Sequence, residues 1–319
     1  EEVKSIKTNK FKFYYYHEFI SKLEGFHIAV SGTHGKTTTT NFIKQLLKDE
    51  PIAYIIGDGT GGGCTNYKYL IYEACEYQDH FLVYNPDILV ITNIDYDHPD
   101  YFKSIDEVRK SFAILKEKSK MTIEQEEYEI IEISKNITIF KYDSNIYSVR
   151  LFGDHLISDL VIAIKVLFKL GFDYKYIVDR LNRIKMPKRR MQESIISNTI
   201  IIEDYGHHPT EINALIQSIN IKYPNIYKIC LFQPHTYSRT LMFYKDFIKS
   251  LRYFDEVYID EVFTSKREPY DLNKQNKINY IFNEFNNYLE FDFDNLDLRK
   301  KQMIIWHSSG KKMCRKENL

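Results

Sequence analysis

The sequence predicts an α/β fold in two parts: a central domain with a mostly parallel sheet, followed by a smaller, Rossmann-like domain. Three observations support this fold class. An apolar strand runs through a glycine-containing turn into a helix at residues 27–47, and residues 88–94 form an almost fully apolar run. From residue 199 to residue 305, strand and helix patterns alternate. A nearly continuous apolar run is typical of a parallel-sheet strand that is buried on both faces.

The first of these stretches has the form of a phosphate-binding loop. Residues 31–40 read Ser-Gly-Thr-His-Gly-Lys-Thr-Thr-Thr-Thr. Gly32 and Gly35 would let the backbone approach a phosphate, and the following helix N-terminus offers free N–H groups. Lys36 would reach the β- and γ-phosphates, and the Thr37 hydroxyl would bind Mg²⁺. An ordinary turn with a solvated lysine is the alternative, but the Gly-x-x-Gly-Lys-Thr pattern favours an ATP or GTP site.

Two further strand ends are expected beside this loop. The predicted strand at 69–72 leads into Glu73, and the strand at 88–94 leads into a loop that contains His98. In open α/β sheets, ligands bind at the carboxyl ends of the strands. Each residue alone could be structural, with Glu73 in a salt bridge and His98 as a capping residue. Their shared position predicts a magnesium site formed by Thr37, Glu73 and His98.

The other elements of the central domain are predicted from hydrophobic periodicity and from the residues that end helices and strands. We expect a short helix around 16–23, a glycine-rich loop at 57–63, and an acidic, solvated stretch at 124–132. The other predicted strands are 53–56 and one or two within 138–149, and the helices are 106–118, 155–170 and 174–184.

Residues 185–190, which are basic and contain a proline, are the expected domain boundary. We therefore predict a connector at 1–24, a central domain at 25–187 and a C-terminal domain at 188–319. In the last domain the predicted strands are 199–202, 227–232, 256–263 and 303–305. One predicted helix begins at residue 210, a second ends at residue 251, and a third lies near 278–289. The adjacent His207 and His208 lack the third ligand that a hydrolytic metal site needs, so we disfavour that interpretation.

Composition excludes several classes of function. Lys+Arg and Asp+Glu are both 44, so nothing in the net charge favours nucleic acid or an anionic membrane as a partner. No apolar run has the roughly 18 residues of a membrane helix. Four widely spaced cysteines without a Cys-x-x-Cys pair predict reduced thiols and a cytoplasmic location.

Five ordered motifs carry a resemblance to a known family. Besides residues 32–40, they are Glu-Ala-Cys-Glu-Tyr at 73–77, Thr-Asn-Ile-Asp-Tyr-Asp-His-Pro-Asp-Tyr-Phe at 92–102, Asp-Tyr-Gly-His-His-Pro-Thr-Glu at 204–211 and Phe-Gln-Pro-His-Thr-Tyr-Ser-Arg-Thr at 232–240. This set resembles the Mur ligases, and within them the members that join L-alanine to UDP-N-acetylmuramate. The resemblance implies an ATP- and Mg²⁺-dependent carboxylate–amine ligase that proceeds through an acyl phosphate.

The resemblance also implies roles for individual residues. Lys36, His208 and Arg239 would be catalytic, and Thr37, Glu73 and His98 would serve the metals. His208, His235 and Arg239 would face the acyl group and the alanine. The implied nucleotide-binding residues are Gly32, Thr33, Gly35, Lys36, Thr37, Thr38, Asp159, Arg190 and Asp204.

Two departures from the family pattern keep an alternative open. The family has asparagines that contact adenine early in the long helix, where this chain has Leu156 and Asp159. The family's N-terminal domain, which binds the UDP part of the substrate, is also expected to be missing before Glu1. The alternative is therefore a truncated nucleotide-binding remnant without ligase activity. The oligomeric state stays open.

Overall fold

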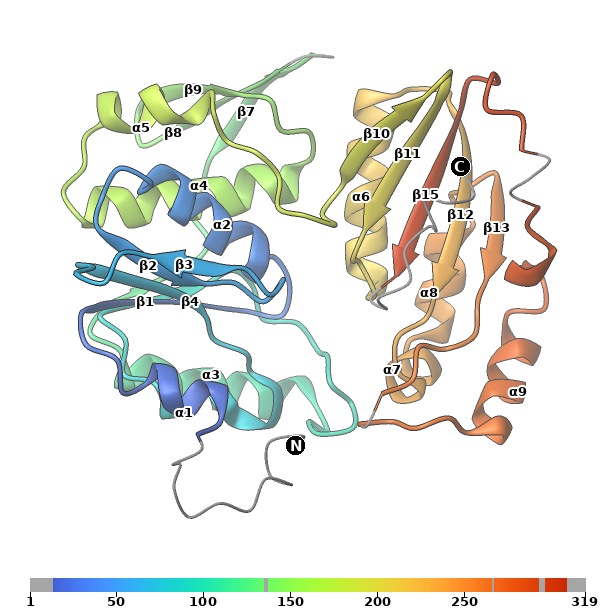
Figure 1. The fold of residues 1–319 in the computed structure, drawn as a ribbon, viewed down its shortest axis with the longest axis horizontal. Coiled ribbons are helices and arrows are strands. Elements are labelled where there is room, and N and C mark those ends of the chain that lie inside the picture. The colour runs from blue at the N-terminus through green and yellow to red at the C-terminus, as the bar shows by residue number, and fades with distance from the viewer. Residues whose placement is uncertain (1–13, 135–136, 266, 293–295, 309–319) are drawn as a thin grey trace.

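The structure, a computed structural model, describes residues 14–134, 137–265, 267–292 and 296–308. The chain forms two halves that lie side by side, each built on a six-stranded sheet (Figure 1). Both sheets are mostly parallel, which confirms the α/β fold class that the sequence predicts. The first 13 residues of the expected connector lie outside the described residues, and the limits at 24/25 and 187/188 stay a prediction.

The sheet of the first half has the order β3-β2-β4-β1-β5-β6, and only the β2–β3 pair is antiparallel. Its two central strands, β1 and β4, pair in parallel over Phe26–Val30 and Tyr69–Glu73. The carboxyl ends of β1, β4 and β5 therefore meet at one edge. The bounds are β1 (Phe26–Ser31), β2 (Ile52–Ile55), β3 (Gly61–Gly63), β4 (Tyr69–Glu73), β5 (Ile88–Ile91) and β6 (Thr122–Ile123).

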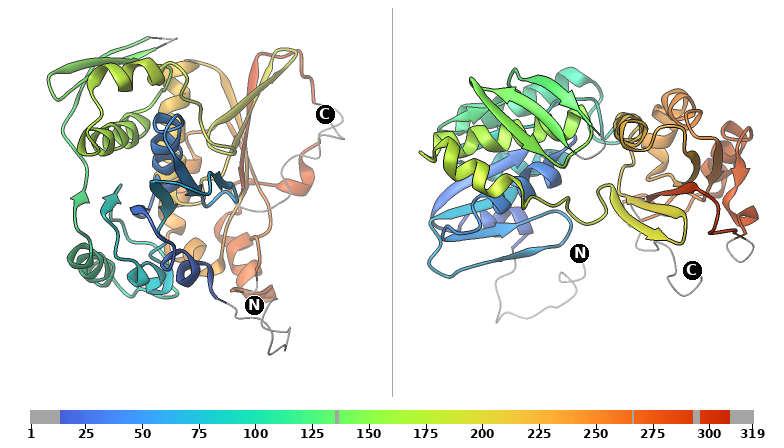
Figure 2. Two further views of the ribbon diagram at one scale, coloured as in Figure 1. Left: turned by 60° about the vertical axis from the view of Figure 1, so that its left-hand side comes forward. Right: turned by 90° about the horizontal axis from the view of Figure 1, so that it is seen from above.

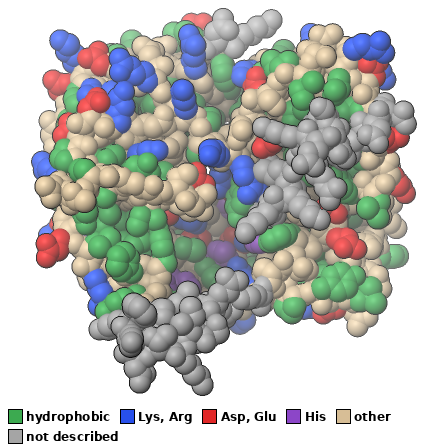
Figure 3. Space-filling model, viewed as in Figure 1, with side chains coloured by type: hydrophobic (Ala, Val, Ile, Leu, Met, Phe, Trp, Pro, Cys, Tyr) green, Lys and Arg blue, Asp and Glu red, His purple; other side chains and the backbone are tan. Residues whose placement is uncertain are grey.

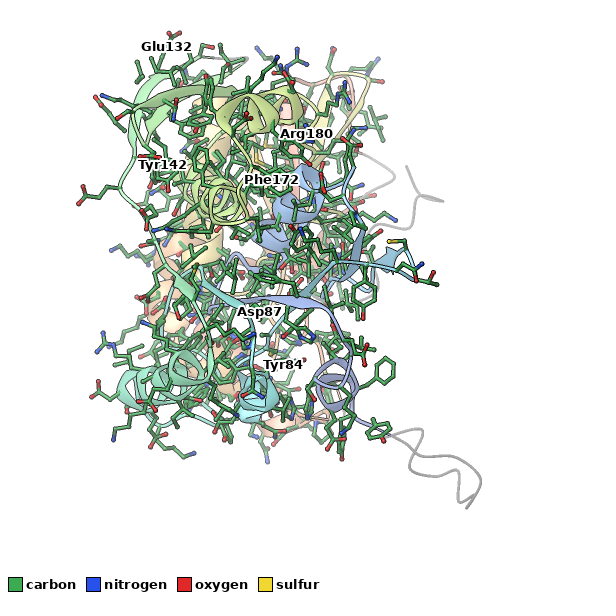
Figure 4. All side chains as sticks on the ribbon, turned by 90° about the vertical axis from the view of Figure 1, so that its left-hand side faces the viewer. Tyr84, Asp87, Glu132, Tyr142, Phe172 and Arg180 are labelled. Atoms are coloured by element: carbon green, nitrogen blue, oxygen red, sulfur yellow. The ribbon has the colours of Figure 1, made fainter. Side chains whose placement is uncertain are left out.

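Helices cover both faces of this sheet (Figures 1 and 2). One face packs against α2 (Lys36–Leu46), α4 (Asp154–Lys169) and α5 (Tyr174–Leu181). The other packs against α1 (Tyr16–Ile20), the 3₁₀ segment η2 (Tyr77–Val83) and α3 (Ile105–Lys118). In Figure 4, Tyr84 lies on the α3 side of the sheet, whereas Phe172 and Arg180 lie on the α4 and α5 side. Burial on both faces explains the continuous apolar run of β5 and the apolar centre of β1 at residues 28–30.

A small antiparallel sheet, β7-β8-β9, lies over α4 and α5. Its strands are β7 (Glu129–Ile133), β8 (Thr138–Tyr142) and β9 (Asn145–Val149). The prediction of strands within 138–149 is confirmed. The prediction of a merely solvated acidic stretch at 124–132 was incomplete, because hydrogen bonding to β8 draws Glu129–Ile133 into an edge strand.

The sheet of the second half has the order β10-β11-β15-β12-β13-β14. Its strands are β10 (Gln192–Ile196), β11 (Thr199–Asp204), β12 (Tyr227–Gln233), β13 (Glu256–Ile259), β14 (Asn286–Asn287) and β15 (Gln302–Ser308). The sequence patterns missed β10, which forms a hairpin with β11 across a two-residue turn at Ser197 and Asn198. Strand β15 is longer than predicted, because it lies between β11 and β12 and is buried throughout.

The helices of the second half pack mainly on one face of its sheet (Figure 2). They are α6 (Pro209–Lys222), α7 (Tyr237–Met242), α8 (Tyr244–Leu251) and α9 (Leu272–Ile281), with a 3₁₀ turn η3 (Tyr288–Glu290). The predicted helix near 278–289 was placed too late in the chain, because the Asp271 carboxylate caps α9 by accepting from the Lys274 N–H at 3.1 Å. No helix among the described residues is long and apolar enough to span a membrane.

Candidate active site between the two halves

The phosphate loop between β1 and α2 is anchored to the end of β5. The Thr33 N–H donates to the Asn93 carbonyl at 3.1 Å, and the His34 N–H donates to Asn93 Oδ1 at 2.9 Å. Gly32 has φ +132°, and a Cβ added there would lie 2.0 Å from Thr92 Oγ1. The loop can therefore approach β5 this closely only with glycine at position 32.

We expect Gly32→Ala to lower the free energy of unfolding by about 2–4 kcal/mol, because both the positive φ and the contact with Thr92 oppose a Cβ. Urea unfolding monitored by circular dichroism would measure this. Gly59→Ala is the matched control, since Gly59 also has positive φ but no atom within 4 Å of an added Cβ. Equal losses in the two variants would contradict the importance of the close approach.

Lys36 is held at the loop by its own neighbours. Its Nζ donates to the Gly32 carbonyl at 2.5 Å and forms an ion pair with Glu76 at 2.9 Å. Burial lowers the pKa of Lys36, but the Glu76 carboxylate outweighs this and raises it overall. Glu76 is only 1% exposed, and the Lys36 charge keeps its pKa below the ordinary value despite burial. Glu76 lies within the motif at 73–77, but the motif alone did not indicate that this residue belongs to the site.

The three predicted metal-binding side chains lie around this ion pair. Burial raises the pKa of Glu73, whose carboxylate accepts from the Gly57 N–H at 2.6 Å and from the Thr37 hydroxyl. His98 faces Glu76 with Nε2 at 3.4 Å, while its Nδ1 lies 3.3 Å from the Arg267 guanidinium. The hydroxyl of Thr37 and the carboxylates of Glu73 and Glu76 are oxygen donors of the kind that Mg²⁺ prefers. This donor set fits the ion.

A cavity of about 400 Å³ opens beside the loop and extends between the two halves. Five of the predicted nucleotide-binding residues line it: Gly35, Thr38, Asp159, Arg190 and Asp204. The other four, Gly32, Thr33, Lys36 and Thr37, form the adjoining phosphate loop and the start of α2. The volume is within the range of small-molecule sites. The remaining lining residues are His34, Asn93, Ile94, Asp95, Gln125, His155, Leu156, Met186, Met191, Thr210, Glu211, Ala214 and Leu215.

Arg239 meets a carboxylate of the protein itself. Its guanidinium forms two hydrogen bonds with Asp97, from Nε at 2.8 Å and from Nη2 at 2.9 Å, and both side chains are buried. Burial would raise the pKa of Asp97, but Arg239 holds it well below the ordinary range. His235 Nδ1 lies 3.1 Å from Arg239 Nη1, and burial together with the Arg239 charge lowers the His235 pKa to about 3. His235 is therefore neutral at physiological pH.

His208 caps α6 and contacts the phosphate loop. Its ring lies 4.7 Å from that of His34, and burial followed by the His34 charge lowers its pKa to about 4. Burial also disfavours a charge on His34, but Asp95 and Glu211 outweigh this and raise its pKa to about 9. Histidine and basic side chains are visible in the hollow between the halves (Figure 3). His34 and His208 thus form a pair with one charged and one neutral ring.

The structure adds residues to the site that the sequence patterns did not single out. Glu211 lies 3.6 Å from His34 Nδ1 and 3.5 Å from Arg190 Nη1, so it joins the loop to the second half. Arg267 pairs with Asp100 of the β5 loop and lies over the Tyr77 ring. Glu211 ends a motif already noted at 204–211, which was the available signal. Arg267 lies in no such motif.

Comparison with known protein families gives a match in the first half of the chain. Residues 30–136 match the Mur ligase middle domain. This match contains the phosphate loop, both carboxylates that flank Lys36, and the complete β5 loop. The resemblance noted from the motifs is therefore supported over this domain.

Solved structures share the fold over both halves. The chain is 20% identical to the UDP-N-acetylmuramate-alanine ligase MurC from Thermotoga maritima, covering 93% of this chain and 75% of that one with a TM-score of 0.74. The chain is 15% identical to the MurF ligase from the same organism, in complex with ADP. That match covers 92% of this chain and 78% of that one, with a TM-score of 0.68. The chain is 14% identical to the Mycobacterium tuberculosis folylpolyglutamate synthase with ADP and AMPPCP. That match covers 89% of each chain, with a TM-score of 0.67. At these identities the likeness establishes the fold.

Proposed function

We propose that this chain is an ATP-dependent carboxylate–amine ligase. The observation that carries the proposal is the contact between the phosphate-loop region and the histidine- and arginine-bearing loops of the second half. Arg239 pairs with Asp97 of the β5 loop, and the His208 ring lies 4.7 Å from that of His34. A cavity lined by residues of both halves opens beside the phosphate loop. Two of the solved structures that share the fold contain ADP. A ligase of this class needs a nucleotide site and an acyl site in contact, and this cavity adjoins both sets of residues.

In the proposed reaction, a substrate carboxylate oxygen attacks the γ-phosphorus of ATP, and ADP leaves with the β-phosphate oxygen. The amine of the second substrate then attacks the acyl carbon, the amide forms, phosphate leaves and the amine loses a proton. Lys36 and the α2 N-terminus would hold the phosphates. Mg²⁺ bound by Thr37, Glu73 and Glu76 would offset phosphate charge, and His98 borders this site. His208 and His235, both neutral, would face the acyl group.

For the substrates we propose UDP-N-acetylmuramate and L-alanine, on the strength of the motifs at 73–77, 92–102, 204–211 and 232–240. Arg239 would bind the alanine carboxylate, since a planar guanidinium can bind a carboxylate through two parallel donors. This reaction consumes ATP and a nucleotide-linked sugar, so the proposal includes a cytoplasmic location.

The test is ADP release by the purified chain with ATP and Mg²⁺. Release should require UDP-N-acetylmuramate and L-alanine together, and mass spectrometry should detect the alanyl product. Folate with glutamate, and muramyl peptides with D-alanyl-D-alanine, are comparison pairs. Release with one of these pairs instead would identify a different ligase, and release with none would refute the ligase proposal.

A nucleotide-binding chain without ligase activity is the second candidate. It is favoured by one observation: Arg239, the group proposed for the amino-acid carboxylate, is already paired with Asp97. Under this candidate, ADP binds in calorimetry but no pair of substrates drives turnover. Formation of the alanyl product by the chain would exclude it.

A further inference from the structure

The Asp159 carboxyl group lies directly behind the phosphate loop. It lines the cavity from α4 and is 7% exposed. A Cβ added at Gly35 would lie 2.6 Å from its Oδ1 and 2.9 Å from its Oδ2. A charged group at this position would act on the loop itself, because so little solvent separates the two.

Asp159 differs from the other carboxyl groups of the cavity in having no ionic partner. Asp95 and Glu211 pair with His34, and Glu211 also pairs with Arg190. Asp204 lies 3.5 Å from His307 Nδ1 and also accepts hydrogen bonds from the N–H groups of Met191 and Gly206. In the part of the chain that the structure describes, none of the ion pairs includes Asp159. A buried carboxyl group without a counter-ion favours its neutral form.

The surroundings of Asp159 support this protonation state. Burial raises the pKa of Asp159 to about 8, although Thr39, Arg190 and His34 act in the opposite direction. At pH 7 the group therefore carries its proton. The other titratable groups near it, from the elements packed around the cavity, are Asp95, Tyr128, Asp154, His155, Asp204 and Glu211.

Part of the wall of this cavity is apolar. Ile94, Leu156, Met186, Met191 and Leu215 come from four separate segments and form this part of it. If the phosphates bind at the α2 N-terminus, as the proposed function requires, the nucleoside extends into this cavity. The apolar side chains then contact the faces of the base, and the Asp159 carboxyl group is a buried polar group available to its edge.

We propose that Asp159 binds the adenine of the nucleotide as a neutral carboxylic acid. This inference rests on the nucleotide site of the proposed function. The Asp159 O–H donates to a ring nitrogen, and its carbonyl oxygen accepts from the exocyclic amine. The ionised form has lost the donor and presents a second acceptor to the ring nitrogen. Binding of adenine nucleotides is therefore linked to one proton on Asp159.

The test is calorimetric binding of ADP between pH 6.5 and 9.5. For one required proton with a pKa of about 8, the dissociation constant should rise about 30-fold between pH 7 and pH 9.5. In Asp159→Asn the amide supplies the same donor and acceptor without titrating, so affinity should stay near the pH 7 value of the wild type. Asp159→Leu should bind ADP about 10-fold more weakly at pH 7, without that pH dependence.

Two controls isolate the effect. His34 also titrates in this range and is retained in Asp159→Asn, so its contribution to phosphate binding appears in both proteins. Asp179→Asn, an exposed position on α5, should follow the wild type. GDP should gain affinity relative to ADP as the pH rises, because ionised Asp159 can accept from two guanine N–H groups.

The outcomes separate this inference from the proposed function. An equal pH slope in the wild type and in Asp159→Asn, or unchanged ADP affinity in Asp159→Leu, would overturn the inference while ADP binding itself stands. Absence of ADP binding by the folded wild type at every pH would refute the proposed function and the inference together. Thermal unfolding of each variant verifies folding.

Discussion

Lys36→Met is expected to reduce ATP turnover by at least about 100-fold, because the side chain supplies the positive charge closest to the proposed phosphate site. In the structure its Nζ already lies at the loop, bound to the Gly32 carbonyl at 2.5 Å. Steady-state ADP release at saturating ATP measures the effect. Lys48→Met, at an exposed lysine just after α2, is the matched control and should be unaffected.

Loss of turnover in Lys36→Met could also reflect loss of folding, because Glu76 would be left buried without its partner. The double variant Lys36→Met/Glu76→Gln removes both charges and should unfold at a higher temperature than Lys36→Met. It should remain inactive. Recovery of turnover in the double variant would contradict a phosphate-binding role for Lys36.

Arg239→Met is expected to lower the free energy of unfolding by about 3–5 kcal/mol, because it leaves the Asp97 carboxylate buried without a counter-ion. The pair joins the two halves, so unfolding of the whole chain should become less cooperative. Denaturant unfolding of Arg239→Met, Asp97→Asn and the double variant forms a double-mutant cycle. The double variant should lose less stability than the sum of the single variants.

Arg252→Met is the control for this cycle. Its ion pair with Glu284 is of similar length, 2.9 Å, but the side chains are 64% and 38% exposed. We expect a change within about 1 kcal/mol. A loss in Arg252→Met as large as that in Arg239→Met would show that burial does not determine the effect.

The same pair gives a pH dependence with a defined sign. Because Arg239 holds the pKa of Asp97 below the ordinary 3.8, the stabilisation is complete above that value and is lost as the pH falls through the folded-state pKa. The difference in unfolding free energy between the wild type and Asp97→Asn should therefore narrow below about pH 4. A constant difference from pH 7 to pH 2.5 would contradict this origin.

The sequence predicted the elements whose information is local. The glycines, Lys36 and Thr37 of the phosphate loop are adjacent in the chain, and burial on both faces of β5 leaves an apolar run. The sequence patterns failed where pairing with a neighbouring strand decides the secondary structure. Strand β10 has few buried residues of its own and is a strand because β11 pairs with it. The last helix, α9, was misplaced for a local reason, since the Asp271 cap was overlooked.

The candidate site was predicted unevenly for the same reason. The spacing of the motifs indicated which strand ends carry polar residues, and five of the predicted nucleotide-binding residues do line one cavity. Their mutual pairing could not be predicted. Asp97 and Arg239 are 142 residues apart, and Glu76 and Lys36 are 40 residues apart. Only the tertiary packing, within the first half for Lys36 and Glu76 and between the halves for Asp97 and Arg239, decides which carboxylate meets which cation.

The sequence by itself therefore determined the α/β class, the phosphate loop and the residue types available for chemistry, because each depends on neighbours within one turn or one strand. The tertiary structure determined which charged side chains pair with one another and which carboxyl group is left neutral. It pairs Arg239 with Asp97 and Lys36 with Glu76, and among the described residues it leaves Asp159 buried without an ionic partner. Protonation depends on solvent exclusion and on contacts between distant segments, and neither is contained in a local pattern.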